Sequence, residues 1–165
     1  MTAASVAATA VAALVSGAPS TMHSIATRRP LLDTVRAAAT LVPRCAPANP
    51  GRPVGAPPLS LGTLVAGGFA HGAVSLFWGT VLAQVLPPGR RAIWGAAAGA
   101  GIHVVDLGLV ARLPHLAAMR ALPQLPQLGD HIAFGATVGF LLDRWDPPMR
   151  STGPAGQATS SSAFG

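Results

Sequence analysis

The stretch LSLGTLVAGGFAHGAVSLFWGTVLAQVL, from Leu59 to Leu86, decides the fold class of this chain. It contains no Asp, Glu, Lys or Arg over its whole length. A helix needs about 20 consecutive apolar residues to cross the hydrocarbon core of a bilayer, and this stretch is longer than that. It therefore predicts a membrane-spanning helix over residues 59–86.

The composition of the whole chain agrees with this prediction. Of its 165 residues, 50% are hydrophobic and only 10% are charged, and the mean hydropathy is +0.49. Soluble domains usually carry about 25% charged residues, so this chain has too few charges to cover a globular surface. The composition favours an all-α integral membrane bundle with the lipid bilayer as its main partner.

Three more apolar runs predict three more helices. Residues 92–113 form a second span, and residues 130–145 form a third, with Asp130 placed to cap its N-terminus. The run 3–22 is weaker because most of its residues are Ala, and the sequence leaves open whether this first helix crosses the membrane. Together these runs predict one membrane domain over residues 1–146.

The first helix is interrupted by the sequence SGAPST. Pro19 has no amide hydrogen and disfavours helical angles in the residue before it. We therefore expect a kink or a helix end around Ser16, Gly17, Pro19 and Ser20. The hydroxyl groups here could bond the backbone groups that such a break leaves free.

The segments between and after the helices set the predicted orientation. Residues 23–58 read as a loop with a short interfacial helix at 31–42, and residues 147–165 read as a disordered tail. Seven Arg residues lie in the first loop, at the end of the second span and in the loop 114–129, against four on the other side. The positive-inside rule then places the loops 23–58 and 114–129 in the cytoplasm, for a multi-pass protein of the plasma membrane.

The net charge of +6 does not indicate nucleic-acid binding. All eleven basic residues are Arg, and they are scattered through the loops rather than arranged as a stripe with aromatic residues. Arg at the ends of apolar segments is instead what contact with anionic lipid predicts. Cys45 is the only cysteine, so the chain has neither an intrachain disulfide nor a CxxC metal motif.

Each of the three expected spans carries a GxxxG pattern. Small residues four positions apart let helix backbones approach closely. We expect these glycines to form the packing stripes of a compact bundle that could also join a second copy or a larger membrane protein; they are Gly68, Gly72, Gly95, Gly99, Gly135 and Gly139.

Ionisable and polar residues lie on or beside these stripes. At about 100° per residue, the helical positions of His71, Ser75, His103, Asp106 and His131 all fall near the glycines of their own helix. An Asp at bilayer depth costs about 2.5–3.5 kcal/mol on insertion scales, so it should face protein and have a partner. The pattern predicts one intramembrane polar cluster.

The sequence leaves the chemistry of this cluster open. His103 and Asp106 could form a hydrogen-bonded pair that only fixes packing, or a pair that accepts or relays protons. Three His and one Asp could also form a zinc set, or facing His residues could hold haem, although no HExxH or CxxC spacing supports either.

The order of the motifs along the chain resembles that of a known group of proteins. An SGAPST break is followed by HGAVSLFWG, HVVD and LGDHIAFGATVG within about residues 10–145. This order resembles small multi-pass membrane proteins of unknown function found in bacteria, which implies the same fold but no activity.

Three functions remain compatible with these features. We first expect a structural or accessory membrane protein, which could be a subunit of a complex. The first alternative is a protein that senses or moves protons or a small ion, and the second is a metal-binding or haem-binding protein. No nucleophile, base and orienting group occur at recognisable spacing, so we expect no enzyme and no cofactor.

Overall fold

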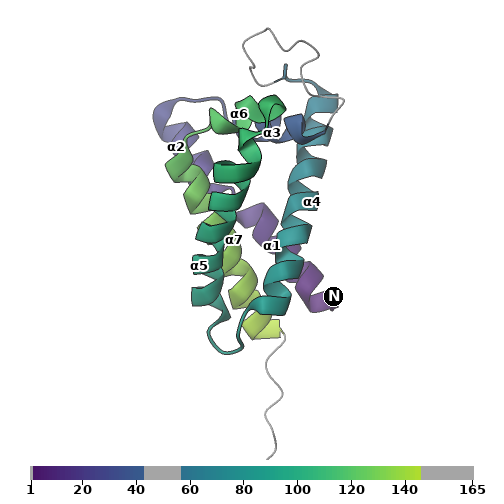
Figure 1. The fold of residues 1–165 in the computed structure, drawn as a ribbon, viewed down its shortest axis with the longest axis vertical. Helices are drawn as coiled ribbons and strands as arrows, with labels where there is room; N and C mark the ends of the chain where they lie inside the picture. The colour runs from purple at the N-terminus through teal and green to yellow at the C-terminus, as the bar shows by residue number, and fades with distance from the viewer. Residues whose placement is uncertain (1, 43–56, 146–165) are drawn as a thin grey trace, which may run out of the picture.

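The computed structural model describes residues 2–42 and 57–145. The regular elements of this part of the chain are all helical (Figure 1). In chain order they are α1 (Ala3–Val15), α2 (Ala18–Thr27), α3 (Asp33–Ala38), the 3₁₀ turn η1 (Ala39–Leu41), α4 (Leu61–Val85), α5 (Arg91–His103), the π-helix η3 (Val104–Leu109), the 3₁₀ turns η4 (Val110–Arg112) and η5 (Pro114–Leu116), α6 (Ala117–Arg120) and α7 (Gln124–Trp145). The predicted all-α class is confirmed, and the predicted tail 147–165 lies outside the described residues.

Three helical runs are long and apolar enough to cross a membrane. They are Ala3–Thr27, Leu61–Val85 and Arg91–Arg112. The first run extends beyond the predicted end at residue 22, because the chain returns to helix directly after the break. It therefore has the length of a span, which the sequence had left open. The predicted interfacial helix 31–42 is reduced to α3 and η1.

The expected span at 130–145 is part of the longer helix α7. This helix begins at Gln124 and is not one of the three apolar runs. Figure 1 shows it running along the bundle beside α5, and it also packs against α1, α2 and α4. Because neighbouring helices surround it, α7 can carry polar residues that a lipid-facing helix could not.

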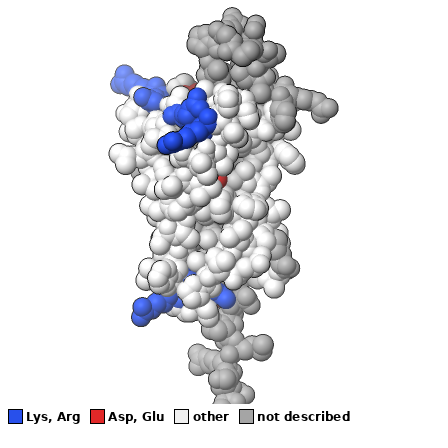
Figure 2. Space-filling view, viewed as in Figure 1, with Lys and Arg blue, Asp and Glu red and all other residues white. Residues whose placement is uncertain are grey.

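The surface of the bundle is divided into an apolar belt and two charged ends. Figure 2 shows blue Arg side chains at both ends, with an almost uncharged surface between them. Large apolar side chains are widely exposed on the bundle, for example Leu14 at 86%, Leu61 at 78% and Phe69 at 72%. Soluble monomers rarely expose such continuous apolar surface, so the belt fits a lipid environment.

The glycines of α5 and α7 bring the two backbones into direct contact. A Cβ atom at Gly95 would overlap the carbonyl group of Gly135, and one at Gly99 would overlap the carbonyl group of His131. A Cβ at Gly139 would likewise overlap the carbonyl group of Arg91. Two of the three predicted stripes therefore face one another.

The prediction for Gly68 and Gly72 was wrong. Both are exposed, and a Cβ on either would meet nothing within 4 Å. The close contacts of α4 are made by Gly67 against Val35 of α3 and by Gly79 against Thr9 of α1. Packing against α3 and α1 thus turns Gly68 and Gly72 away from the neighbouring helices.

Replacing Gly135 with Ala should destabilise the bundle, whereas Gly68→Ala should not. The new methyl group of Gly135→Ala overlaps the α5 backbone, and such overpacking costs about 1–3 kcal/mol. At Gly68 the methyl group meets open space, and Ala is the better helix former by about 1 kcal/mol. Thermal unfolding in detergent micelles, followed by circular dichroism, measures the difference. Equal unfolding temperatures for the two variants would contradict the α5–α7 contact.

Candidate functional site

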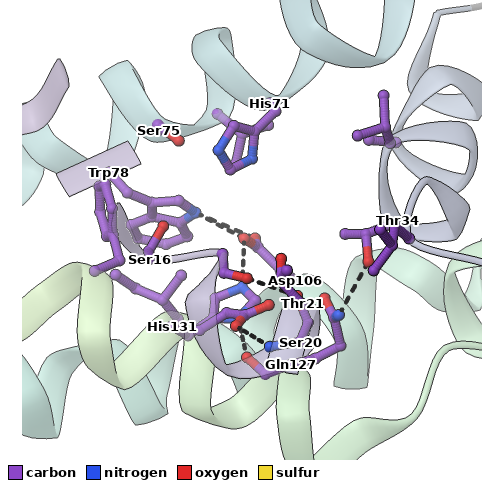
Figure 3. Close-up of a pocket in the computed structure, with 18 residues that line it drawn as sticks. Ser16, Ser20, Thr21, Thr34, His71, Ser75, Trp78, Asp106, Gln127 and His131 are labelled. Atoms are coloured by element: carbon purple, nitrogen blue, oxygen red, sulfur yellow. Dashed lines mark hydrogen bonds and ion pairs between the residues drawn. The ribbon is translucent and has the colours of Figure 1, made fainter. Parts of the chain in front are cut away.

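A cavity of about 230 Å³ lies where the break in the first helical run meets α3, α4, η3 and α7 (Figure 3). Of the predicted cluster, His71, Ser75, Asp106 and His131 line this cavity, whereas His103 does not. The remaining polar lining residues are Ser16, Ser20, Thr21, Thr34, Trp78, Gln127 and Asp130. The fold thus joins four predicted residues from three elements with the predicted helix break.

Asp106 is held by the indole of Trp78. The Trp78 Nε1–H group donates to both carboxylate oxygens, at 3.2 Å to Oδ1 and 3.1 Å to Oδ2. Asp106 lies in the π-helix η3, where the predicted continuous helix 92–113 changes its winding. Short π-helical turns inside α-helices occur frequently at functional sites.

His131 faces Asp106 from α7. Its Nε2 atom lies 3.6 Å from Asp106 Oδ2, while Nδ1 lies 2.7 Å from the carbonyl oxygen of Gln127. A carbonyl oxygen can only accept, so Nδ1 carries the hydrogen of this bond. When His131 is neutral, its Nε2 therefore bears a lone pair that faces a carboxylate oxygen. A proton on Nε2 turns this contact between acceptors into an ion pair.

The expected pair of His103 with Asp106 is not formed. The His103 ring packs edge-on against the His131 ring, with centroids 5.3 Å apart and an interplanar angle of 78°. Its buried Nδ1 has no hydrogen-bond partner among the described residues. A π-helix turns less per residue than an α-helix, so Asp106 is rotated away from His103 and toward Trp78 and His131.

The helix break is stabilised by its own hydroxyl groups and by a side chain of α4. Ser16 ends α1 and Gly17 precedes α2, as the SGAPST pattern predicts. The Nε2 atom of His71, on α4, lies 3.1 Å from the carbonyl oxygen of Ala13. The hydroxyl of Ser16 also reaches this oxygen at 3.4 Å, and the hydroxyl of Ser20 donates to the carbonyl oxygen of Gly17 at 3.3 Å.

Asp130 caps a helix other than the one predicted. It lies inside α7, and its Oδ1 accepts a hydrogen bond of 2.9 Å from the backbone N–H of Ser20 in the first turn of α2. Amide groups in the first turn of a helix have no partner within that helix, and carboxylates are favoured there. The sequence prediction failed because Pro126 and Gly129, which resemble helix boundaries, both lie inside α7. A proline is tolerated in the first turn of a helix, where its missing N–H group would have no partner.

The site also contains three residues that were not predicted as members of it from the sequence: Trp78, Gln127 and Asp130. Trp78 could have been found, because it follows Ser75 by three residues and His71 by seven and so lies on the same side of α4. Gln127 had no such signal, because it precedes the predicted start of the last helix. Within residues 2–42 and 57–145, no three His, Cys, Asp or Glu side chains are placed to hold a metal ion.

Replacing Asp130 should loosen the helix break without affecting the Asp106–His131 contact. In Asp130→Ala the buried amide of Ser20 loses its acceptor, which costs about 1–3 kcal/mol of unfolding free energy. Asp130→Asn keeps an oxygen in place and should cost less. Asp33→Ala, outside the cavity, is the control, and unfolding in micelles is the measurement. A loss for Asp130→Ala no larger than that of the control would contradict the role of Asp130 as a cap.

Comparison of the chain with protein-family models, with curated proteins and with solved structures found no match. The resemblance to small bacterial membrane proteins therefore stays a prediction. The proposed function is therefore inferred from the geometry of the cavity.

Proposed function

We propose that this protein is a proton-responsive integral membrane protein that binds and releases one proton at the Asp106–His131 pair. The observation that carries this proposal is the contact between His131 Nε2 and Asp106 Oδ2, combined with the Nδ1 contact to the Gln127 carbonyl. A histidine with a carboxylate neighbour titrates in the physiological range. The proposal thus follows the proton-sensing alternative from the sequence.

The apolar surroundings of the Asp106–His131 pair make an uncompensated charge energetically costly. Asp106 lies in the third apolar run, where an uncompensated carboxylate is costly. The His131 imidazolium compensates this charge. Within residues 2–42 and 57–145, the loss of its proton leaves the Trp78 N–H group as the hydrogen-bond donor to the carboxylate. Protonation therefore changes the attraction between α4, η3 and α7, the three elements that carry these side chains.

The cavity supplies a route for the proton. Among its lining residues, His71, Thr21 and Leu31 are exposed, so the cavity is open beside α4, α2 and the segment before α3. The side chains of Asp106 and His131 are 18% and 19% exposed, so neither is sealed inside the bundle.

We place the protein in the plasma membrane with one Arg-rich end in the cytoplasm. This end carries Arg28 and Arg29 after α2, Arg36 in α3, Arg112 in η4 and Arg120 in α6. The opposite end carries Arg90 and Arg91 before and at the start of α5, and Arg144 near the end of α7. The excess of Arg at the first end favours the cytoplasm under the positive-inside rule.

A structural or accessory role is the second candidate. The direct backbone contact of α5 with α7 favours it, because it produces a rigid bundle without any titrating group. In that case the Asp106–His131 contact would fix only the packing of the helices, and its protonation would not change within the physiological range.

Trp78 provides a test, because its indole N–H donates directly to the carboxylate that faces His131. In a Trp94→Phe, Trp145→Phe background Trp78 is the only tryptophan. We expect its emission to change between about pH 5 and pH 8, the range in which a histidine side chain ordinarily changes its charge. His131→Gln should abolish the His step, whereas His115→Gln, outside the cavity, should leave it unchanged.

Two outcomes would overturn the proposal. The first is an emission that stays constant over this pH range in the folded protein. The second is a titration that survives both His131→Gln and Asp106→Asn. Circular dichroism of each variant establishes that the helical bundle is present. A constant emission together with a reduced unfolding temperature in Asp106→Asn would support the structural role instead.

A further inference from the structure

The cavity has the chemistry of a site for a small organic cation. Its walls are largely apolar, with Leu31, Val35, Val74, Ile102 and Phe134 among the lining residues. Two carboxylates, Asp106 and Asp130, line it as well, and none of its lining residues is Arg. An apolar site that carries carboxylates favours a molecule with an apolar body and a positive charge.

The size of the cavity favours an occupant larger than a bare ion. A volume of about 230 Å³ is several times the about 30 Å³ that one water molecule takes up in the liquid. A bare ion would leave most of the apolar wall without contact. An organic cation with a compact apolar group fills this space and buries apolar surface.

Trp78 adds a second group that recognises a cation. It lines the cavity, and its N–H group is already used by the Asp106 carboxylate. The indole ring is the best aromatic partner for an ammonium group, within about 6 Å of its centroid. The side chain that holds Asp106 therefore also offers its ring to a ligand beside the carboxylate.

The titratable groups around Asp106 determine how a cation would bind. Asp130 and His131 face the cavity from α7, His71 faces it from α4, and His103 of α5 contacts the His131 ring. The linings from α1, α2 and α3 are apolar groups and hydroxyls. His71 and Asp130 are engaged at the helix break, so the charge that varies next to Asp106 is the proton on His131.

We propose that the cavity binds a small organic monocation with an apolar body, and that this cation takes the place of the proton shared by Asp106 and His131. With the proton bound, the pair is neutral overall; without it, the pair carries one negative charge. A monocation beside Asp106 compensates the charge of the pair in place of the proton, so cation and proton compete with one another. The inference rests on the proposed function, because it names the ligand that competes with the proton at the same pair.

The test uses the full chain in micelles with Trp78 as its only tryptophan. Benzyltrimethylammonium is the cationic probe, and neopentylbenzene is the uncharged control of the same shape. We expect a saturable change of Trp78 emission with the cation and none with the control. On the acid side of the titration of the pair, the apparent affinity should fall about tenfold for each pH unit, because one proton competes with one cation.

Substitutions assign the binding to the carboxylate. Asp106→Asn should weaken cation binding at least about tenfold, because it removes the negative charge that attracts the ammonium group, whereas Asp33→Asn outside the cavity should not. His131→Gln keeps the carboxylate and removes the competing His proton, so it should retain binding and lose most of its dependence on pH. If Asp106→Asn does not fold, the pH dependence of His131→Gln still tests the inference.

Each contrary result has its own meaning. Equal binding of the charged and uncharged probes, or cation binding that does not depend on pH, overturns this inference. The absence of cation binding overturns it as well. If the emission of Trp78 still titrates without any probe, the proposed proton-responsive function survives that failure. If that titration is also absent, both proposals fail.

Discussion

Direct contact between the backbones of α5 and α7 fixes how close the two helices lie, and with it the geometry of the cavity. Gly99 of α5 packs against the carbonyl group of His131, so one of the direct backbone contacts between the two helices occurs at the residue that faces Asp106. Any side chain at Gly99 would force the helices apart. The separation of His131 from Asp106 is therefore set by a glycine that takes no part in the chemistry of the cavity.

The broken first run depends on its neighbours in a similar way. A break inside an apolar helix exposes carbonyl and amide groups that lipid cannot satisfy. Here His71 of α4 reaches the carbonyl oxygen of Ala13, and Asp130 of α7 accepts from the amide of Ser20. The break is stabilised only when α4 and α7 are in place, and the space beside it forms part of the cavity.

Helix irregularity and buried charge occur together in this bundle. The cavity is bordered by the break at Ser16–Gly17 on one side and by the π-helix η3 on the other. Where regular helices would pack closely, these two departures leave a space lined by carboxylate, imidazole and indole groups. Buried charges are expensive in a membrane unless they are paired, and the Trp78–Asp106–His131 arrangement supplies the partners.

Hydropathy and helical periodicity are local properties, so the sequence alone predicts the helical class, the spans near 59–86 and 92–113, the position of the break and four of the cavity residues. It could not determine that Asp106 pairs with His131 rather than His103, since the π-helix changes the rotation of the backbone between positions 103 and 106. The sequence also did not predict that Asp130 caps α2 or that Gly68 faces away from the neighbouring helices. Those outcomes depend on which helices become neighbours, and only the tertiary packing decides that.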